Sequence, residues 1–115
     1  HPKICAHLLG QIIKAFGVDH ILFGTDSIWW GSPQWQIEAL RRFQIPEDMQ
    51  EQFGYAPISD EDKSKILGLN AAKLYDVNVE DRRQQIITDR MTQLKEVYLA
   101  EGGKPSNNVY GWIMS

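Results

Sequence analysis

The 115-residue chain is 43% hydrophobic and 23% charged, with a mean hydropathy of −0.38, a composition that is ordinary for a soluble domain. Its net charge is only −3 and it has no basic stripe, so we expect no nucleic-acid partner. No apolar run approaches the roughly 20 residues of a membrane-spanning helix, so we expect no membrane partner. The single cysteine, Cys5, excludes an internal disulfide and is interpreted as a small buried apolar group. The compartment stays open, although the cytoplasm is favoured.

An amphipathic helix is expected over residues 2–16. Pro2 suits its first turn, and Gly17 suits a left-handed residue just past its end. His7 lies on this helix, and we interpret it as structural or solvated rather than as a metal ligand. The apolar stripe that predicts the helix repeats every three or four positions and consists of Ile4, Cys5, Leu8, Leu9, Ile12, Ile13 and Phe16.

One buried strand of the parallel type is predicted next, at about residues 20–24. Residues 21–23 form a continuous apolar run, which suits a strand covered on both faces. Gly24 allows a turn, and Asp26 stands where the strand would end. In α/β folds and in (β/α)₈ barrels, loops converge on a site at the carboxyl ends of the strands. Asp26 is therefore the candidate reacting group, while His20 would lie at the opposite end of the strand.

Trp29 and Trp30 lie in an aromatic loop that follows Asp26. They would line a substrate pocket, because aromatic loops bind planar or apolar groups, or one of them would pack under the following helix. Both interpretations stay open. Pro33 is expected to begin that following helix, and a further short helix is expected to run to Phe53.

A capping box is predicted at Ser59, because an acidic residue, Asp62, follows it three positions later and an apolar stretch comes next. Gly68 is expected to end the helix that this box begins. Asn70 is expected to cap another helix.

A longer amphipathic helix is predicted over residues 78–101, followed by an extended tail over residues 102–115. The tail contains apolar residues that would anchor it against another surface, so we expect a homo-oligomer formed through this helix and tail. The narrow apolar stripe of the helix would lie across a barrel or a neighbouring subunit and consists of Ile87, Met91, Leu94 and Tyr98.

Two strings of the sequence resemble a known family. Residues 21–27 read Ile-Leu-Phe-Gly-Thr-Asp-Ser, and residues 66–75 read Ile-Leu-Gly-Leu-Asn-Ala-Ala-Lys-Leu-Tyr. In this order they resemble the carboxyl-terminal end of metal-dependent enzymes of the amidohydrolase superfamily. The resemblance is to the second branch of that superfamily, which includes hydrolases and non-oxidative decarboxylases on a TIM-barrel fold. In the family, the first string is the eighth barrel strand and the second opens the last helix.

The resemblance implies that Asp26 is a metal ligand or a general base. The enzyme would hold a divalent metal, zinc foremost, whose bound water attacks a C–N or C–O bond of a small-molecule substrate, or it would decarboxylate an aromatic acid. Trp29 and Trp30 would contact that substrate. The other metal ligands would come from earlier strands of the barrel.

A complete (β/α)₈ barrel takes about 250 residues, so we expect this chain to be its C-terminal fragment, predominantly helical with the one strand. Residues 1–77 would be the last helix–strand–helix units of the barrel. The start at His-Pro without Met also suggests a truncated chain. Such a fragment alone is expected to be inactive and free of metal, because one carboxylate does not hold a catalytic metal.

A non-catalytic helical module is the alternative, derived from such an enzyme and retained for packing or interaction. The short length and the long terminal helix favour it. Phosphoryl transfer by an aspartate nucleophile is a third option, less favoured because the strand has no second Asp two residues after the first.

Overall fold

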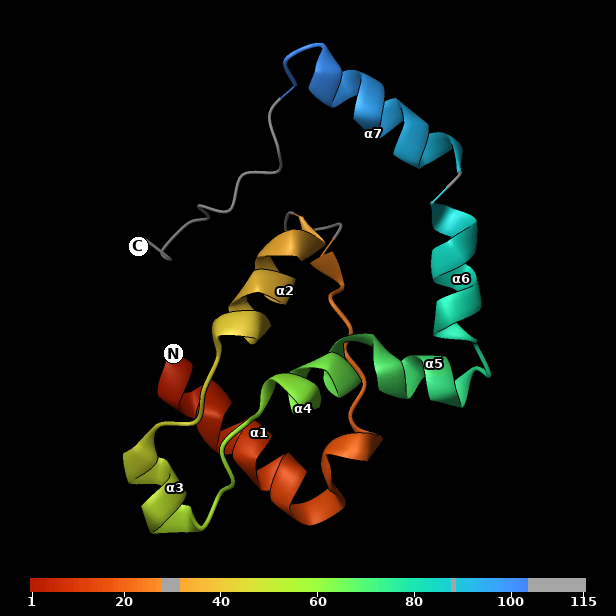
Figure 1. The fold of residues 1–115 in the computed structure, drawn as a ribbon. Coiled ribbons are helices and arrows are strands. Elements are labelled where there is room, and N and C mark those ends of the chain that lie inside the picture. The colour runs from red at the N-terminus through yellow and green to blue at the C-terminus, as the bar shows by residue number, and fades with distance from the viewer. Residues whose placement is uncertain (28–31, 88, 104–115) are drawn as a thin grey trace. The chain divides into compact units, whose positions relative to one another are not determined.

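The computed structural model describes residues 1–27, 32–87 and 89–103 (Figure 1). The chain divides into two compact units, the first of residues 1–75 and the second beginning at residue 76. Both predicted substrate-contacting tryptophans, Trp29 and Trp30, lie outside the described residues, as does most of the predicted tail.

The described chain is mostly helical. The first unit consists of α1 (Pro2–Phe16), the 3₁₀ turn η1 (Val18–His20), α2 (Pro33–Arg42), α3 (Glu47–Phe53), α4 (Asp60–Ser64), the π-helix η3 (Lys65–Leu69) and α5 (Asn70–Leu74). The second unit contains α6 (Val79–Ile86) and α7 (Arg90–Ala100).

The strand predicted at about residues 20–24 is not formed, and the expectation of an α/β fold was wrong for the described residues. His20 ends η1, and residues 21–26, called here the connecting run, have no strand beside them in the described part of the chain. Leu22 is 45% exposed, so the run is not covered on both faces. A strand requires a neighbouring strand for its hydrogen-bond ladder, and a short apolar run does not specify that neighbour. No part of a barrel sheet is therefore seen in these residues.

The helix starts predicted at Pro2 and Pro33 and the helix end predicted at Phe53 are confirmed in the first unit. Pro2 occupies the first turn of α1, and Ser32 caps α2 by accepting the backbone N–H of Gln34 at 3.2 Å. Helix α1 ends before Gly17, whose φ of 80° is positive but whose ψ of 153° is not that of the left-handed cap that we expected. Cys5, however, is exposed rather than buried.

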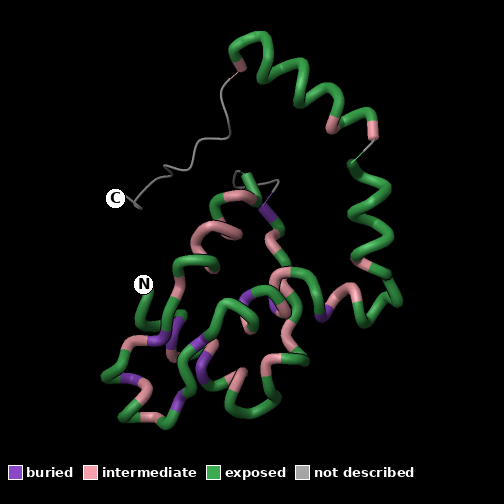
Figure 2. The backbone as a smooth tube through the Cα atoms, viewed as in Figure 1, coloured by how far each residue is buried: buried purple, intermediate pink, exposed green. Residues whose placement is uncertain are grey.

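The hydrophobic core of the first unit lies between α1, α3 and the loops around α3. In Figure 2 the buried residues gather in this unit, whereas both described helices of the second unit have none. The fully or nearly buried members are Ala6, Ile45, Met49, Tyr55 and Ile58, and Leu9, Ile13, Phe43 and Phe53 pack against them.

The ring of Tyr55 lies directly against the backbone of α1 at Gly10. A Cβ atom added at Gly10 would lie 2.6 Å from Cδ2 of the tyrosine, closer than carbon atoms approach one another. The tyrosine hydroxyl also lies 2.9 Å from Nδ1 of His7 on the next turn of the same helix. His7 thus has the structural role that we expected.

The single helix predicted over residues 78–101 is replaced by two. Asn78 caps α6 by accepting the N–H groups of Glu80 and Asp81, and Asp89 caps α7 by accepting the N–H of Thr92 at 2.7 Å. An Asp at a helix N-cap is favoured over the same residue in a helix interior, which explains the interruption. The residues of the predicted apolar stripe are exposed. No helix in residues 1–27, 32–87 and 89–103 is long and apolar enough to cross a membrane.

We predict that Gly10→Ala destabilises the first unit by about 1–3 kcal/mol, because the added methyl group would force the Tyr55 ring or α1 to move. Gly68→Ala is the matched control, since it adds the same methyl group to a helical backbone with no atom within 4 Å. That substitution should be neutral or stabilising. Urea unfolding followed by circular dichroism measures both. Equal stability of the two variants would contradict the close packing of Tyr55 on α1.

Candidate functional site

Asp26 ends the connecting run in an unusual backbone conformation. Its φ is 43°, in the left-handed region that non-glycine residues rarely adopt, although Asp tolerates it better than most. Its side chain is exposed and makes no hydrogen bond or ion pair with any described residue. A carboxylate held in this way is available to a ligand, because no neighbour in the described part of the chain neutralises it.

The residues on either side of Asp26 are fixed by hydrogen bonds. Nε2 of Gln36, on α2, donates to the carbonyl oxygen of Thr25 at 3.0 Å. The hydroxyl of Ser27 donates to Oγ1 of Thr25 at 3.1 Å, and Ser27 is only 3% exposed. The backbone is therefore held immediately before Asp26, and the side chains on either side of it are bonded to each other.

The π-helix η3 holds the middle of the connecting run. The backbone N–H of Asn70 donates to the carbonyl of Lys65, five residues earlier, rather than to Ile66 four residues earlier as in an α-helix. The carbonyl of Ile66 accepts the N–H of Phe23 at 3.1 Å. The widened turn thus gives the run a backbone partner in place of a strand.

The side chain of Asn70 holds the start of the same run. Its Nδ2 donates to the carbonyl oxygens of Val18 at 2.8 Å and Ile21 at 2.9 Å, and the residue is 8% exposed. Asn70 therefore does not cap a helix, and Gly68 does not end one, as we had expected, because the backbone remains helical from η3 into α5. The two strings that carry the family resemblance are in direct contact through these bonds.

An ion pair adds to this attachment. Nζ of Lys65 lies 3.2 Å from Oδ1 of Asp19 in η1 and 3.6 Å from Oε1 of Glu61 in α4. The hydrogen bond and charge of Asp19, followed by the charge of Glu61, raise the pKa of the Lys65 ammonium. The lysine thus joins η1 and α4 to the helical stretch that carries Asn70.

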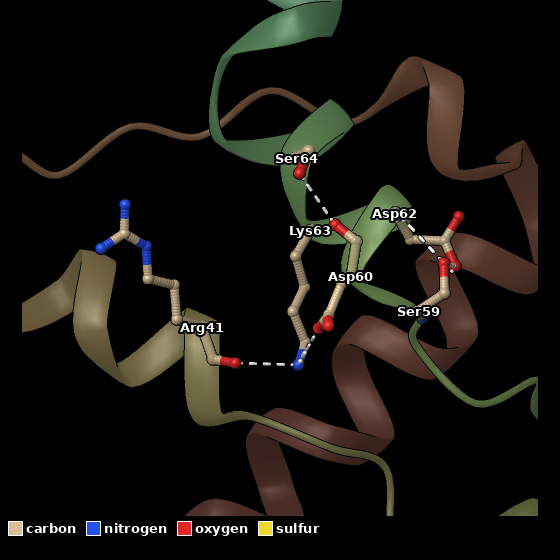
Figure 3. A network of polar contacts seen from close by, with 6 residues as sticks. All are labelled: Arg41, Ser59, Asp60, Asp62, Lys63 and Ser64. Atoms are coloured by element: carbon tan, nitrogen blue, oxygen red, sulfur yellow. Dashed lines mark hydrogen bonds and ion pairs between the residues drawn. The ribbon is translucent and has the colours of Figure 1, made fainter.

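The helix that leads into η3 is fixed at its start by the predicted capping box, which is confirmed (Figure 3). The Ser59 hydroxyl accepts the N–H of Asp62 at 3.1 Å, and Oδ2 of Asp62 accepts both the hydroxyl and the N–H of Ser59. The hydroxyl bond, followed by the backbone bond, lowers the pKa of the Asp62 carboxyl. Nζ of buried Lys63 donates to the carbonyl of Arg41 at 2.8 Å, so α4 is also tied to the end of α2.

A groove of about 460 Å³, which Asp26 does not line, lies between α1 and the end of α3. It is lined by His7, Gln11, Lys14, Ala15, Phe53 and Tyr55. Its main polar groups are already used, since Nζ of Lys14 donates to the carbonyl of Phe53 at 2.8 Å and His7 contacts the Tyr55 hydroxyl. These contacts serve the packing of α1 on α3, and we assign no site to the groove.

The donor groups of the described residues do not by themselves fit a catalytic metal. No group of three His, Cys, Asp or Glu side chains that could hold an ion occurs in residues 1–27, 32–87 and 89–103. The remaining positions contain none of these four residue types. His20 is exposed in η1, and neither it nor His7 joins Asp26 in a site. Asp26 is a suitable oxygen ligand, but a metal site would need ligands from outside these 115 residues.

A family model described as Amidohydrolase matches residues 2–77, which includes both strings and the elements that bring them together. The chain therefore belongs to the amidohydrolase family. Comparison with curated proteins and with solved structures found no match.

The sequence did not reveal Gln36 or the real role of Asn70. No pattern marks Gln36, because its partner is a backbone carbonyl in a distant loop. For Asn70 the signal that was available is an amide placed inside an otherwise apolar helical string, where a cap was the more usual explanation. Sequence reasoning did find Asp26, and whether it acts in chemistry stays a prediction.

We predict that Ser59→Ala lowers the free energy of unfolding by about 1 kcal/mol at pH 7, because α4 loses its N-cap. Folding lowers the pKa of the Asp62 carboxyl. The contribution of this carboxyl to the free energy of unfolding is therefore fully present above the ordinary aspartate pKa of about 3.9, and it is lost as pH falls through the lower folded value. The difference between the wild type and Ser59→Ala should therefore shrink below about pH 4. Urea unfolding at several pH values measures it, with Ser64→Ala in the same helix as a control. A difference that does not change with pH would contradict the pairing of Ser59 with Asp62.

Proposed function

We propose that this chain carries part of the active site of a metal-dependent hydrolase, with Asp26 as the carboxylate that binds the metal or accepts a proton. Membership of the amidohydrolase family supports a hydrolase origin. A divalent metal, zinc being the first candidate, would supply a water of lowered pKa when bound. The role of Asp26 is to present a carboxylate oxygen to the cation or to the water bound on it.

The conformation and exposure of Asp26 are the observation that supports this proposal. A non-glycine residue in the left-handed region costs on the order of 1 kcal/mol, and such residues gather at functional sites. Asp26 receives no hydrogen bond in return from the described residues. The backbone before Asp26 is held at Thr25 by a bond from α2 and at Phe23 by a bond from η3, which supports a conformation imposed by the surrounding structure.

The reaction and substrate follow from the family only in outline. We propose hydrolysis of a C–N or C–O bond of a small molecule, or decarboxylation of an aromatic acid. Trp29 and Trp30 come shortly after Asp26 in the sequence and are proposed to contact the substrate, because indole rings bind planar or apolar groups. The other metal ligands are proposed to come from further sequence or from a second copy of the chain.

A non-catalytic packing module is the second candidate. The observation that favours it is the lack of any three-ligand group in the described part of the chain. In that case Asp26 would be an exposed loop residue without a partner. The two candidates differ in whether the protein binds metal through Asp26.

We predict that Asp26→Asn removes bound metal and lowers metal-dependent hydrolysis by at least about 100-fold, because the amide cannot replace an anionic ligand or base. The measurement is metal content by mass spectrometry, together with hydrolysis of amide and ester substrates. It is made on the 115-residue chain and on the longest natural form of the same protein. Zinc, manganese or iron is expected in the longer form.

Asp76→Asn is the matched control, since Asp76 is also exposed and has a φ of 52°. It should leave metal content and activity unchanged. A further variant, Asp26→Gly, relieves the backbone strain and should raise stability by up to about 1 kcal/mol while removing metal-dependent activity. A longer form without metal, or metal content that Asp26→Asn does not alter, would reject the hydrolase proposal and favour the packing module.

A further inference from the structure

The hydrogen bond from Gln36 acts on the peptide group directly before Asp26. Its acceptor, the carbonyl oxygen of Thr25, belongs to the same planar unit as the backbone nitrogen of Asp26. Gln36 lies on α2 and is half-buried, so its side chain comes from an element other than the connecting run. This bond therefore relates the orientation of that peptide plane to the position of α2.

The orientation of this plane decides where the carboxylate of Asp26 points. The angle φ is a rotation about the bond between the backbone nitrogen and Cα. A φ of 43° therefore gives the side chain of Asp26 a defined direction only when the preceding peptide plane is fixed. Asn70 fixes the run earlier, at Val18 and Ile21. Gln36 fixes it one residue before Asp26.

We propose that Gln36 is a positioning residue for Asp26. This inference rests on the proposed function, because it assigns Gln36 to the same site. Gln36 does not touch the reacting groups itself. It holds the Thr25 peptide so that Asp26 keeps its left-handed backbone and directs its carboxylate away from the protein.

The other side chains near this bond do not replace it. Ser27 donates to the side chain of Thr25 and leaves the carbonyl to Gln36. Gln34, on the same helix, donates instead to Oε1 of Glu38 at 2.9 Å, one turn along α2. Gln34 is thus a second glutamine on α2, but its side-chain amide makes a hydrogen bond within that helix.

The test compares Gln36→Leu with Gln34→Leu as the matched control. Leucine approximates the shape of glutamine and lacks the N–H donor. Nuclear magnetic resonance of the 115-residue chain reports the φ of Asp26 through two signals of its amide proton and Hα. These signals are the three-bond coupling between the two protons and the nuclear Overhauser effect between them. Gln36→Leu should change both signals toward an averaged conformation. Gln34→Leu should leave them as in the wild type.

A second variant, Gln36→Glu, keeps the length of the side chain and places a carboxylate in place of the amide that donates to the Thr25 carbonyl. It should change the Asp26 signals at least as much as Gln36→Leu, and it provides the test if the leucine variant does not fold. In the metal-binding form of the protein, both variants should lower metal affinity or activity by about 10- to 100-fold, which is the usual effect of removing a group that orients a ligand. Gln34→Leu should not lower either.

Unchanged Asp26 signals in both Gln36 variants would overturn the proposal, whatever the metal content of the protein. Altered Asp26 signals together with lowered metal affinity would support it. If the Asp26 signals change in the Gln36 variants while Asp26→Asn leaves metal content unchanged, the positioning role is supported and the proposed hydrolase function is rejected. The two hypotheses therefore fail on different measurements.

Discussion

The π turn of η3 is the constraint on which the arrangement of both family strings depends. In a regular α-helix the carbonyl of Ile66 would accept the N–H of Asn70, but here that N–H turns to Lys65 and Ile66 accepts the N–H of Phe23. The same residue, Asn70, then uses its side-chain amide on two further carbonyls of the segment before Phe23. One irregular turn thus supplies three hydrogen bonds to residues 18–23. These bonds replace part of what a neighbouring strand would have supplied, since buried backbone groups must find partners.

The elements that the sequence predicted well are those whose cause is local. Pro2 begins α1, and the reciprocal bonds of Ser59 and Asp62 begin α4, because both signals act within one turn of a helix. The strand at about residues 20–24 failed for the opposite reason. Its apolar run is compatible with several structures, and the choice among them depends on what lies alongside, which here is η3. The long helix over residues 78–101 failed because Asp89 was treated as a helical residue when its side chain is better used as a cap.

The candidate site could be predicted from the sequence to the extent of one residue. Asp26 is identifiable because a turn glycine and an apolar run precede it, and the family match covers that stretch. Its surroundings were not predictable, since Gln36 and Asn70 act on backbone carbonyls, which every residue carries and no sequence pattern distinguishes. His7 contacts Tyr55 and His20 lies in η1, and the interpretation that neither is a metal ligand stays a prediction.

The two left-handed aspartates of the chain have different physical causes. Asp76 comes two residues after Leu74, the last residue of α5, and a residue with positive φ commonly terminates a helix, as Gly54 does after α3. Asp26 follows no helix, since the connecting run separates it from η1. Bonds from α2 and η3, which lie far from each other in the sequence, hold the backbone before it at Thr25 and Phe23. A helix end accounts for the φ of Asp76 but not for that of Asp26, whose exposed carboxylate has no partner among the described residues, and a ligand-binding role for it stays a prediction.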